Sequence, residues 1–192
     1  ATNSSVGSNN AKVSSLDSGY IAGIELGRKV TDIFAVGLEY NYKGKTNFVI
    51  PSDQYGSGTS SYTWGVKSQA VMLNVSADLM QKSRITPYVK LGVGVSRNSS
   101  NDYIITNTST AGANTTSNYS SKTTSNFAWQ AGFGFNVDYN KRISTDISYN
   151  FMNRGKVKTK SYLNIGDVSV PATEKSVKLK DHIIAVGLKV KF

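Results

Sequence analysis

The feature that most constrains this chain is a two-residue alternation along its last segment, residues 182–192 (HIIAVGLKVKF). Every second residue from His182 to Phe192 forms one row, and all of its members except His182 are apolar. The residues between them form a second row, whose members are small or charged except Ile183. A period of two indicates a β-strand, because successive side chains in a strand point to opposite faces. The contrast between an apolar row and a row of Gly, Ala and polar residues recurs in every strand that the sequence predicts. This pattern is typical of a transmembrane β-barrel, in which apolar side chains face lipid and polar side chains face the interior.

Seven segments alternate in this way and are predicted to be strands: residues 18–28, 33–43, 64–79, 85–96, 126–139, 143–153 and 182–192. Short turns and long segments alternate between them, and the long segments (44–62, 97–125 and 154–181) are predicted to be irregular loops. Barrels of bacterial outer membranes likewise join their strands by short turns at one end and longer loops at the other. We therefore predict an all-β fold, a transmembrane, antiparallel, up-and-down β-barrel that forms a single domain over residues 1–192.

The number of predicted strands is odd, whereas single-chain bacterial barrels normally have an even number. Residues 1–16 are rich in Ser and Asn, show no period and are predicted to be an outer loop. We therefore expect the native protein to have eight strands, the first of which precedes this sequence. Irregular completion of the wall by the N-terminal residues is the alternative.

A soluble β-barrel or sandwich also alternates, but with its apolar row inside. Three features favour the membrane barrel. The strands have about the ten residues that a membrane crossing needs. The polar rows are rich in Gly and Ala, and the chain ends on Phe192.

Composition limits the chemistry that the chain can perform. The chain has no Cys and one His, so disulfides, thiolate metal sites and Cys nucleophiles are excluded, and we expect no cofactor and no metal. The single histidine, His182, is the one candidate catalytic base, and the spacing supplies neither a Ser nucleophile nor an acidic partner, so we expect no enzymatic activity. The formal net charge of +10 favours acidic partners. Basic residues form no single stripe, which argues against nucleic-acid binding.

The densest positive charge lies in residues 154–181, the predicted partner-binding region. The candidate residues are Arg154, Lys156, Lys158, Lys160, Tyr162, Lys175, Lys178 and Lys180. Arg154 and the next lysines alternate, so an outward continuation of the strand would place them on one face. One interpretation is a contact with an anionic partner; the other is a solvated edge whose charge discourages strand aggregation.

The polar rows also carry charges of both signs, which a narrow barrel would enclose. We predict an interior charge network of Glu25, Glu39, Lys90, Asp146 and Lys189, because buried charges need partners.

Several segments resemble known proteins: residues 127–137 (FAWQAGFGFNV), 147–151 (ISYNF) and 182–192. They are similar to the opacity-type, OmpA-like outer-membrane barrels. The likeness extends to the small rickettsial surface adhesin barrels in the strand around 126–130, in YNFMNRGK (149–156) and in KDH (180–182). The resemblance implies a bacterial outer-membrane protein whose outer loops bind host cell-surface or serum proteins. Alternatives are a structural anchor without a specific partner and a lipid-modifying barrel enzyme. We expect a monomer in contact with outer-membrane lipids.

Overall fold

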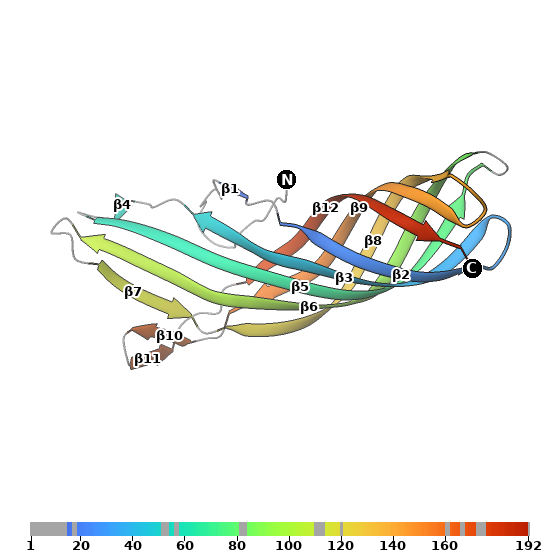
Figure 1. The fold of residues 1–192 in the computed structure, drawn as a ribbon. Coiled ribbons are helices and arrows are strands. Elements are labelled where there is room, and N and C mark those ends of the chain that lie inside the picture. The colour runs from blue at the N-terminus through green and yellow to red at the C-terminus, as the bar shows by residue number, and fades with distance from the viewer. Residues whose placement is uncertain are drawn as a thin grey trace.

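The structure, a computed structural model, describes residues 15–16, 19–50, 54–55, 58–80, 84–109, 114–119, 121–159, 162–165, 168–171 and 176–191. Seven long strands form one curved sheet, here called the wall, in which each strand pairs antiparallel with the next wall strand along the chain (Figure 1). In order they are β2 (Ile21–Lys29), β3 (Phe34–Ile50), β5 (Gly58–Asp78), β6 (Ile85–Ser109), β8 (Lys122–Asp138), β9 (Ile143–Lys158) and β12 (Ser176–Val190). The predicted all-β antiparallel fold is therefore confirmed as a seven-stranded half-barrel.

The wall ends at β2 on one side and at β12 on the other, and no pairing between these two strands occurs within the described residues. The expectation of an eighth strand concerns chain outside this sequence and stays a prediction. Residues 1–14, part of the predicted first loop, lie outside the described residues, whereas β1 (Ser15–Leu16) pairs with β3. No helix in the described part of the chain has the length and apolar content needed to cross a membrane.

The short connections after β2, β5 and β8 lie together near the C-terminus, at what we call the turn end (Figure 1). Side chains fix two of these turns. The Thr31 hydroxyl accepts hydrogen bonds from the backbone amides of Ile33 and Phe34, and Asn140 Oδ1 accepts bonds from Arg142 and Ile143. Such local bonds are why Thr and Asn favour turns over continued strands. The opposite end is called the loop end.

Outward side chains form apolar rows across the wall. Four successive rows over β3, β5, β6 and β8 are Phe34–Ala77–Val89–Phe133, Val36–Val75–Leu91–Ala131, Leu38–Leu73–Val93–Trp129 and Tyr40–Val71–Val95–Phe127. The large side chains of these rows are exposed, with 65% of Leu91 and 60% of Phe133 accessible, and the two alanines are half-exposed. A soluble protein rarely exposes apolar patches larger than a few hundred Å². The alternative of a soluble barrel or sandwich is therefore wrong for this chain.

The height of the apolar surface matches a bilayer. The outward residues of β6 are apolar from Ile85 to Val95, which spans about 33 Å along the strand. At a strand tilt of about 40°, this length covers about 25 Å of bilayer, the height of the apolar band of outer-membrane barrels. Toward the loop end the next row is polar, and we call it the boundary row: Tyr42–Gln69–Arg97–Ser125.

Glycines in the inward rows make room for amide side chains. Gly92 lies opposite Asn74, and Gly132 lies opposite Asn150. A Cβ added at either glycine would collide with the Oδ1 atom of the facing Asn. The small residues of the polar rows are therefore required by the width of the interior.

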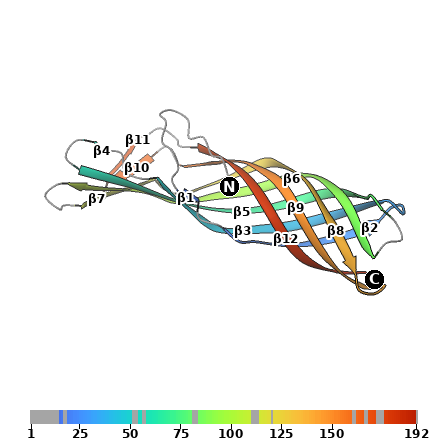
Figure 2. The ribbon, with the colours of Figure 1, turned by 90° about the horizontal axis from the view of Figure 1, so that it is seen from above.

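The long segments predicted as irregular loops are in large part strands, which corrects that prediction. All wall strands except β2 continue past the boundary row. Three further strands extend the sheet from β6: β7 (Asn114–Tyr119) pairs with β6, β10 (Tyr162–Ile165) with β7, and β11 (Val168–Pro171) with β10. The short strand β4 (Gln54–Tyr55) pairs with β5. Figure 2 shows β7, β10 and β11 at the end of the molecule away from the C-terminus, beyond the ends of β9 and β12. The Ser-, Thr- and Asn-rich sequences past the boundary row have no lipid-facing side, so the apolar alternation that reveals the wall is absent there.

Bulges interrupt the strand pairing at the loop end. Strands β3, β6 and β9 each have one extra residue relative to a neighbour, at residues 44–45, 101–102 and 154–155. A bulge bends its strand and increases the local twist, and bulges are common at barrel rims. Where one occurs, the alternation of inward and outward side chains shifts by one residue.

Candidate functional site

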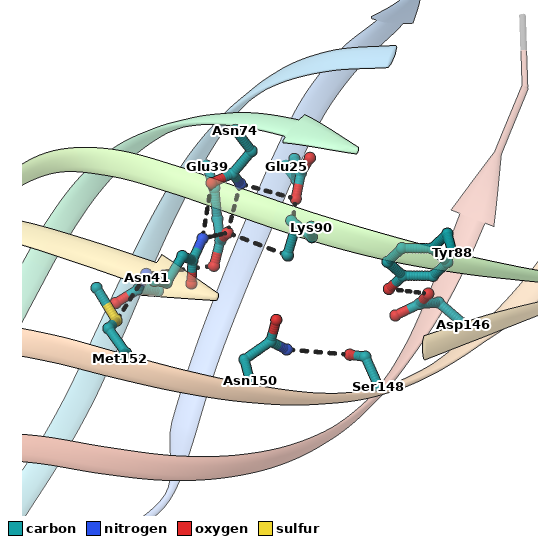
Figure 3. Close-up of polar contacts among 11 residues, drawn as sticks. Glu25, Glu39, Asn41, Asn74, Tyr88, Lys90, Asp146, Ser148, Asn150 and Met152 are labelled. Carbon is teal, nitrogen blue, oxygen red and sulfur yellow. Dashed lines mark hydrogen bonds and ion pairs between the residues drawn. The ribbon is translucent and has the colours of Figure 1, made fainter. Parts of the chain in front are cut away.

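A charge cluster occupies the interior toward the turn end (Figure 3). Lys90 Nζ lies 3.4 Å from Glu25 Oε2 and 3.4 Å from Glu39 Oε2. The cluster therefore holds two carboxylates and one ammonium group. Strands β2, β3 and β6 bring these residues together because each of them occupies an inward row.

Amide side chains compensate the excess negative charge at Glu39. Gln130 Nε2 and Asn74 Nδ2 each donate to Glu39 Oε2 at 2.7 Å, and Asn41 Nδ2 donates to Oε1 at 3.2 Å. Hydrogen bonds to a charged group contribute more than those between neutral groups. These amides were not predicted as members of the network, although their positions on the inward rows of the sequence could have indicated them.

The other two predicted network residues lie apart from this cluster. Asp146 accepts a hydrogen bond of 2.6 Å from the Tyr88 hydroxyl (Figure 3). Lys189 lies on β12, at the end of the wall, and its side chain is exposed. The structure thus brings Glu25, Glu39 and Lys90 together and does not bring Asp146 or Lys189 to them.

A second charge cluster lies in the interior toward the loop end. Arg154 Nε is 2.7 Å from Asp181 Oδ2, and Lys43 Nζ is 2.5 Å from Asp181 Oδ1. The side chains are 0%, 5% and 9% exposed for Arg154, Asp181 and Lys43. Because Arg154 is fully buried, its predicted place among the outer partner-binding residues is wrong.

Met72, Ala70, Ala128 and Met152 form an apolar layer in the interior. On β5 the layer lies between Asn74, which contacts the first charge cluster, and Ser68, whose hydroxyl lies 3.4 Å from Arg154 Nη1. The interior is therefore built in layers, with charge at both ends and thioether and methyl groups between them.

The bulge in β9 brings its backbone across the interior toward β6. The carbonyl oxygen of Arg154 accepts hydrogen bonds from Ser96 Oγ at 2.5 Å and Asn98 Nδ2 at 2.7 Å. Further along β9, the carbonyl of Lys156 accepts a bond of 2.7 Å from Asn126 Nδ2. The two bonds to Arg154 join β6 to β9, which are not neighbours in the wall, whereas the bond to Lys156 joins the adjacent strands β8 and β9.

The same bulge separates the predicted binding residues. Gly155 has a φ of 76°, which favours glycine. Because of the bulge, the inward side chain after Arg154 is that of Val157, and Lys156 points outward. The expectation that Arg154 shares one face with the lysines that follow it is therefore wrong. Lys178 lies directly opposite Lys156, and Lys178, Lys156 and Lys180 are all exposed on the outward face, whereas Lys158 is half-buried. Lys160, Lys175 and the side chain of Tyr162 lie outside the described residues.

His182 faces outward at the edge of the apolar band. Its Nδ1 lies 2.5 Å from the Tyr149 hydroxyl, and its ring meets Phe151 edge-on at 5.2 Å. Among the described residues no carboxylate is recorded in contact with it, and no group of His, Asp or Glu could hold a metal ion. These contacts are those of an aromatic girdle at a membrane surface.

The seven carboxylates whose side chains the structure describes lie inside the barrel or at the turn end. Glu25, Glu39, Asp146 and Asp181 face the interior, whereas Asp32, Asp78 and Asp138 belong to the turn end. At the turn end, Lys29 pairs with Asp78 and Lys191 with Asp138. Among the residues whose side chains the structure describes, the outward face of the loop end therefore carries exposed cations and no carboxylate.

The family to which the chain is similar agrees with this architecture. A family model described as the outer membrane protein beta-barrel domain matches residues 1–192. The structure is similar to a crystal structure of Neisserial surface protein A (NspA), with a TM-score of 0.47 and 14% sequence identity over 91% of this chain and 84% of that chain. None of the curated proteins compared with the chain matches it. Since the family model covers the whole sequence, this chain belongs to the outer membrane protein beta-barrel domain family and is located in the bacterial outer membrane.

Proposed function

We propose that this protein is a surface adhesin whose loop end binds an acidic segment of a host cell-surface or serum protein. The observation that carries the proposal is a set of three outward cations, here called the rim lysines: Lys156, Lys178 and Lys180. Two of them, Lys156 and Lys178, face each other directly across β9 and β12. Like charges in this position repel and destabilise the strand pair, and an acidic partner would relieve the repulsion.

The projecting strands support the same proposal. Strand β6 continues from Arg97 to Ser109, about 40 Å along the strand beyond the apolar band. In outer-membrane barrels the longer connections lie outside the cell. Polar strands of this length on a rigid wall hold a binding surface away from the membrane. Outward cations attract acidic partners across several ångströms of solvent.

Charge reversal of the rim lysines tests the proposal. Cells that display the Lys156→Glu/Lys178→Glu/Lys180→Glu variant are compared with wild type for adherence to host-cell monolayers and for binding to immobilised serum and matrix proteins. We expect at least a tenfold loss of binding, and wild-type binding should weaken as salt is added.

The matched control makes the same change of charge at the turn end, with Arg84→Glu/Lys141→Glu/Arg142→Glu; all three residues are exposed. This variant should bind like wild type. Equal binding by wild type and the rim variant, with both folded, would contradict adhesion through the rim lysines and would favour the structural-anchor alternative.

A further inference from the structure

A depression on the outward face of the wall lies beside the boundary row, on strands away from the rim lysines. It has a volume of about 280 Å³ and is lined by Tyr42, Lys67, Ser68, Gln69, Arg97 and Ser99. Tyr42, Gln69 and Arg97 are consecutive members of the boundary row on β3, β5 and β6. The depression therefore lies where the lipid-facing surface changes from apolar to polar.

Two cations line this depression. Gln69 pairs with Arg97 and Lys67 pairs with Ser99, so Lys67 and Arg97 are diagonal neighbours on one face, about 7–8 Å apart at the backbone. Both side chains are exposed, and no carboxylate is among the described residues that line the depression. The Gln69 amide, the Tyr42 hydroxyl and the Ser99 hydroxyl supply further hydrogen-bonding groups. This arrangement suits a compact anion with several oxygen acceptors.

An apolar surface begins immediately below the depression. The next row toward the turn end contains Tyr40, Val71 and Val95, with 43%, 48% and 59% of each residue exposed. Three more apolar rows follow on the same strands. A ligand that fits both parts has an anionic head at Lys67 and Arg97 and hydrocarbon chains along the wall.

We propose that Lys67 and Arg97 bind the phosphate of an outer-leaflet lipid whose acyl chains lie on the apolar rows below. Arg supplies a planar fork of donors that suits phosphate oxygens, and Lys adds a mobile point charge. Tyr42 contacts the Tyr20 ring with centroids 6.5 Å apart, which places two aromatic side chains beside the head group. Tyr is favoured at this level of a membrane because its ring is apolar and its hydroxyl is polar.

Native mass spectrometry of the folded protein in a non-ionic detergent tests this proposal. The probes are bis-phosphorylated lipid A, dephosphorylated lipid A with the same acyl chains, and inorganic phosphate. Wild type is compared with Lys67→Gln/Arg97→Gln and with the control Lys141→Gln/Arg142→Gln, which removes the same charge at the turn end. We expect about thirtyfold weaker binding of phosphorylated lipid A in the first variant, roughly fivefold for each cation, and little change in the control.

Each comparison can overturn the proposal. Equal loss in both variants would show charge attraction without a site. Equal binding of the two forms of lipid A to wild type would exclude phosphate recognition, a result that needs no variant and is independent of variant folding. Effective competition by inorganic phosphate at the concentration of the lipid would exclude a contribution from the acyl chains. If Lys67→Gln/Arg97→Gln instead loses binding to immobilised serum proteins and retains lipid A, the depression belongs to a protein-binding surface.

Discussion

At the turn end of the interior, two carboxylates share one lysine, whereas at the loop end, two cations share one carboxylate. Three amides bond to Glu39 in the first cluster, and the Glu25 side chain remains 37% exposed. In the second cluster, Asp181 is 5% exposed and pairs with both Lys43 and Arg154. We therefore expect the loss of one charged side chain to lower the stability less in the first cluster, where amides and solvent can still bond to the remaining charges, than in the second, where the remaining charges are buried.

The largest expected effect comes from removing the shared carboxylate of the loop end. Asp181→Asn leaves Lys43 and Arg154 without a counter-charge, and breaking a buried pair in this way costs about 3–5 kcal/mol. The free energy of unfolding of the protein in lipid vesicles, measured in urea, gives the value. Lys90→Met at the turn end should cost less, about 1–3 kcal/mol, because Glu39 keeps its amide donors. A larger loss for Lys90→Met would reverse the comparison.

The next effect tests the apolar band that separates the two ends. Leu91→Arg places a cation on the lipid face near the middle of the band and should cost about 2–4 kcal/mol. Gln69→Arg makes a similar change in the boundary row and should cost about 0–1 kcal/mol, since the penalty falls toward the membrane surface. Vesicle unfolding measures both, and equal costs would place the boundary row elsewhere.

A smaller effect concerns the bulge, a feature of the loop end. Gly155→Ala forces a side chain into a left-handed backbone and against Asn126, so we expect a loss of about 1–3 kcal/mol. Gly187 on β12 has open space, with Asp146 Cβ 3.9 Å from an added Cβ, and Gly187→Ala should change stability by less than about 0.5 kcal/mol. If Gly155→Ala proves equally neutral in unfolding experiments, the backbone of β9 does not require glycine.

The smallest expected effect lies at the exposed turn end. Lys29 pairs with Asp78 at 2.7 Å, but 58% of its side chain is exposed. Lys29→Gln should therefore cost about 0.2–1 kcal/mol, and added salt should reduce this difference. A cost approaching that of Asp181→Asn would mean that burial does not distinguish the two ends.

Alternation predicts the wall well because lipid acts on one face of each strand. Phe34 and Leu91 were expected to face outward and do so, since each belongs to an uninterrupted apolar row. The strand ends at the loop end were not predictable in this way. Beyond the boundary row both faces of a strand contact water or other polar strands, so composition no longer distinguishes a strand from a loop.

Arg154 shows why the candidate site was predicted only in part. It stands in a basic stretch of sequence, and its partner Asp181 is 27 residues away. Two signals were present: Asp181 belongs to the inward row of the last strand, and Gly155 interrupts the alternation after Arg154. Periodicity can indicate the row, but only the pairing of β9 with β12 shows that the two charges meet.

The central claim is that apolar side chains face lipid and polar side chains face the interior, and the chain offers a direct measurement because it contains no Cys. Single Cys substitutions at Lys90, Leu91, Val93, Val95 and Ser96 on β6 each carry one nitroxide label in vesicles. Electron paramagnetic resonance then compares collisions with oxygen, which concentrates in lipid, and with a water-soluble nickel complex. High oxygen accessibility at 91, 93 and 95 and low oxygen accessibility at 90 and 96 is the predicted result. The opposite alternation, or none along the strand, would contradict the assigned faces of the barrel.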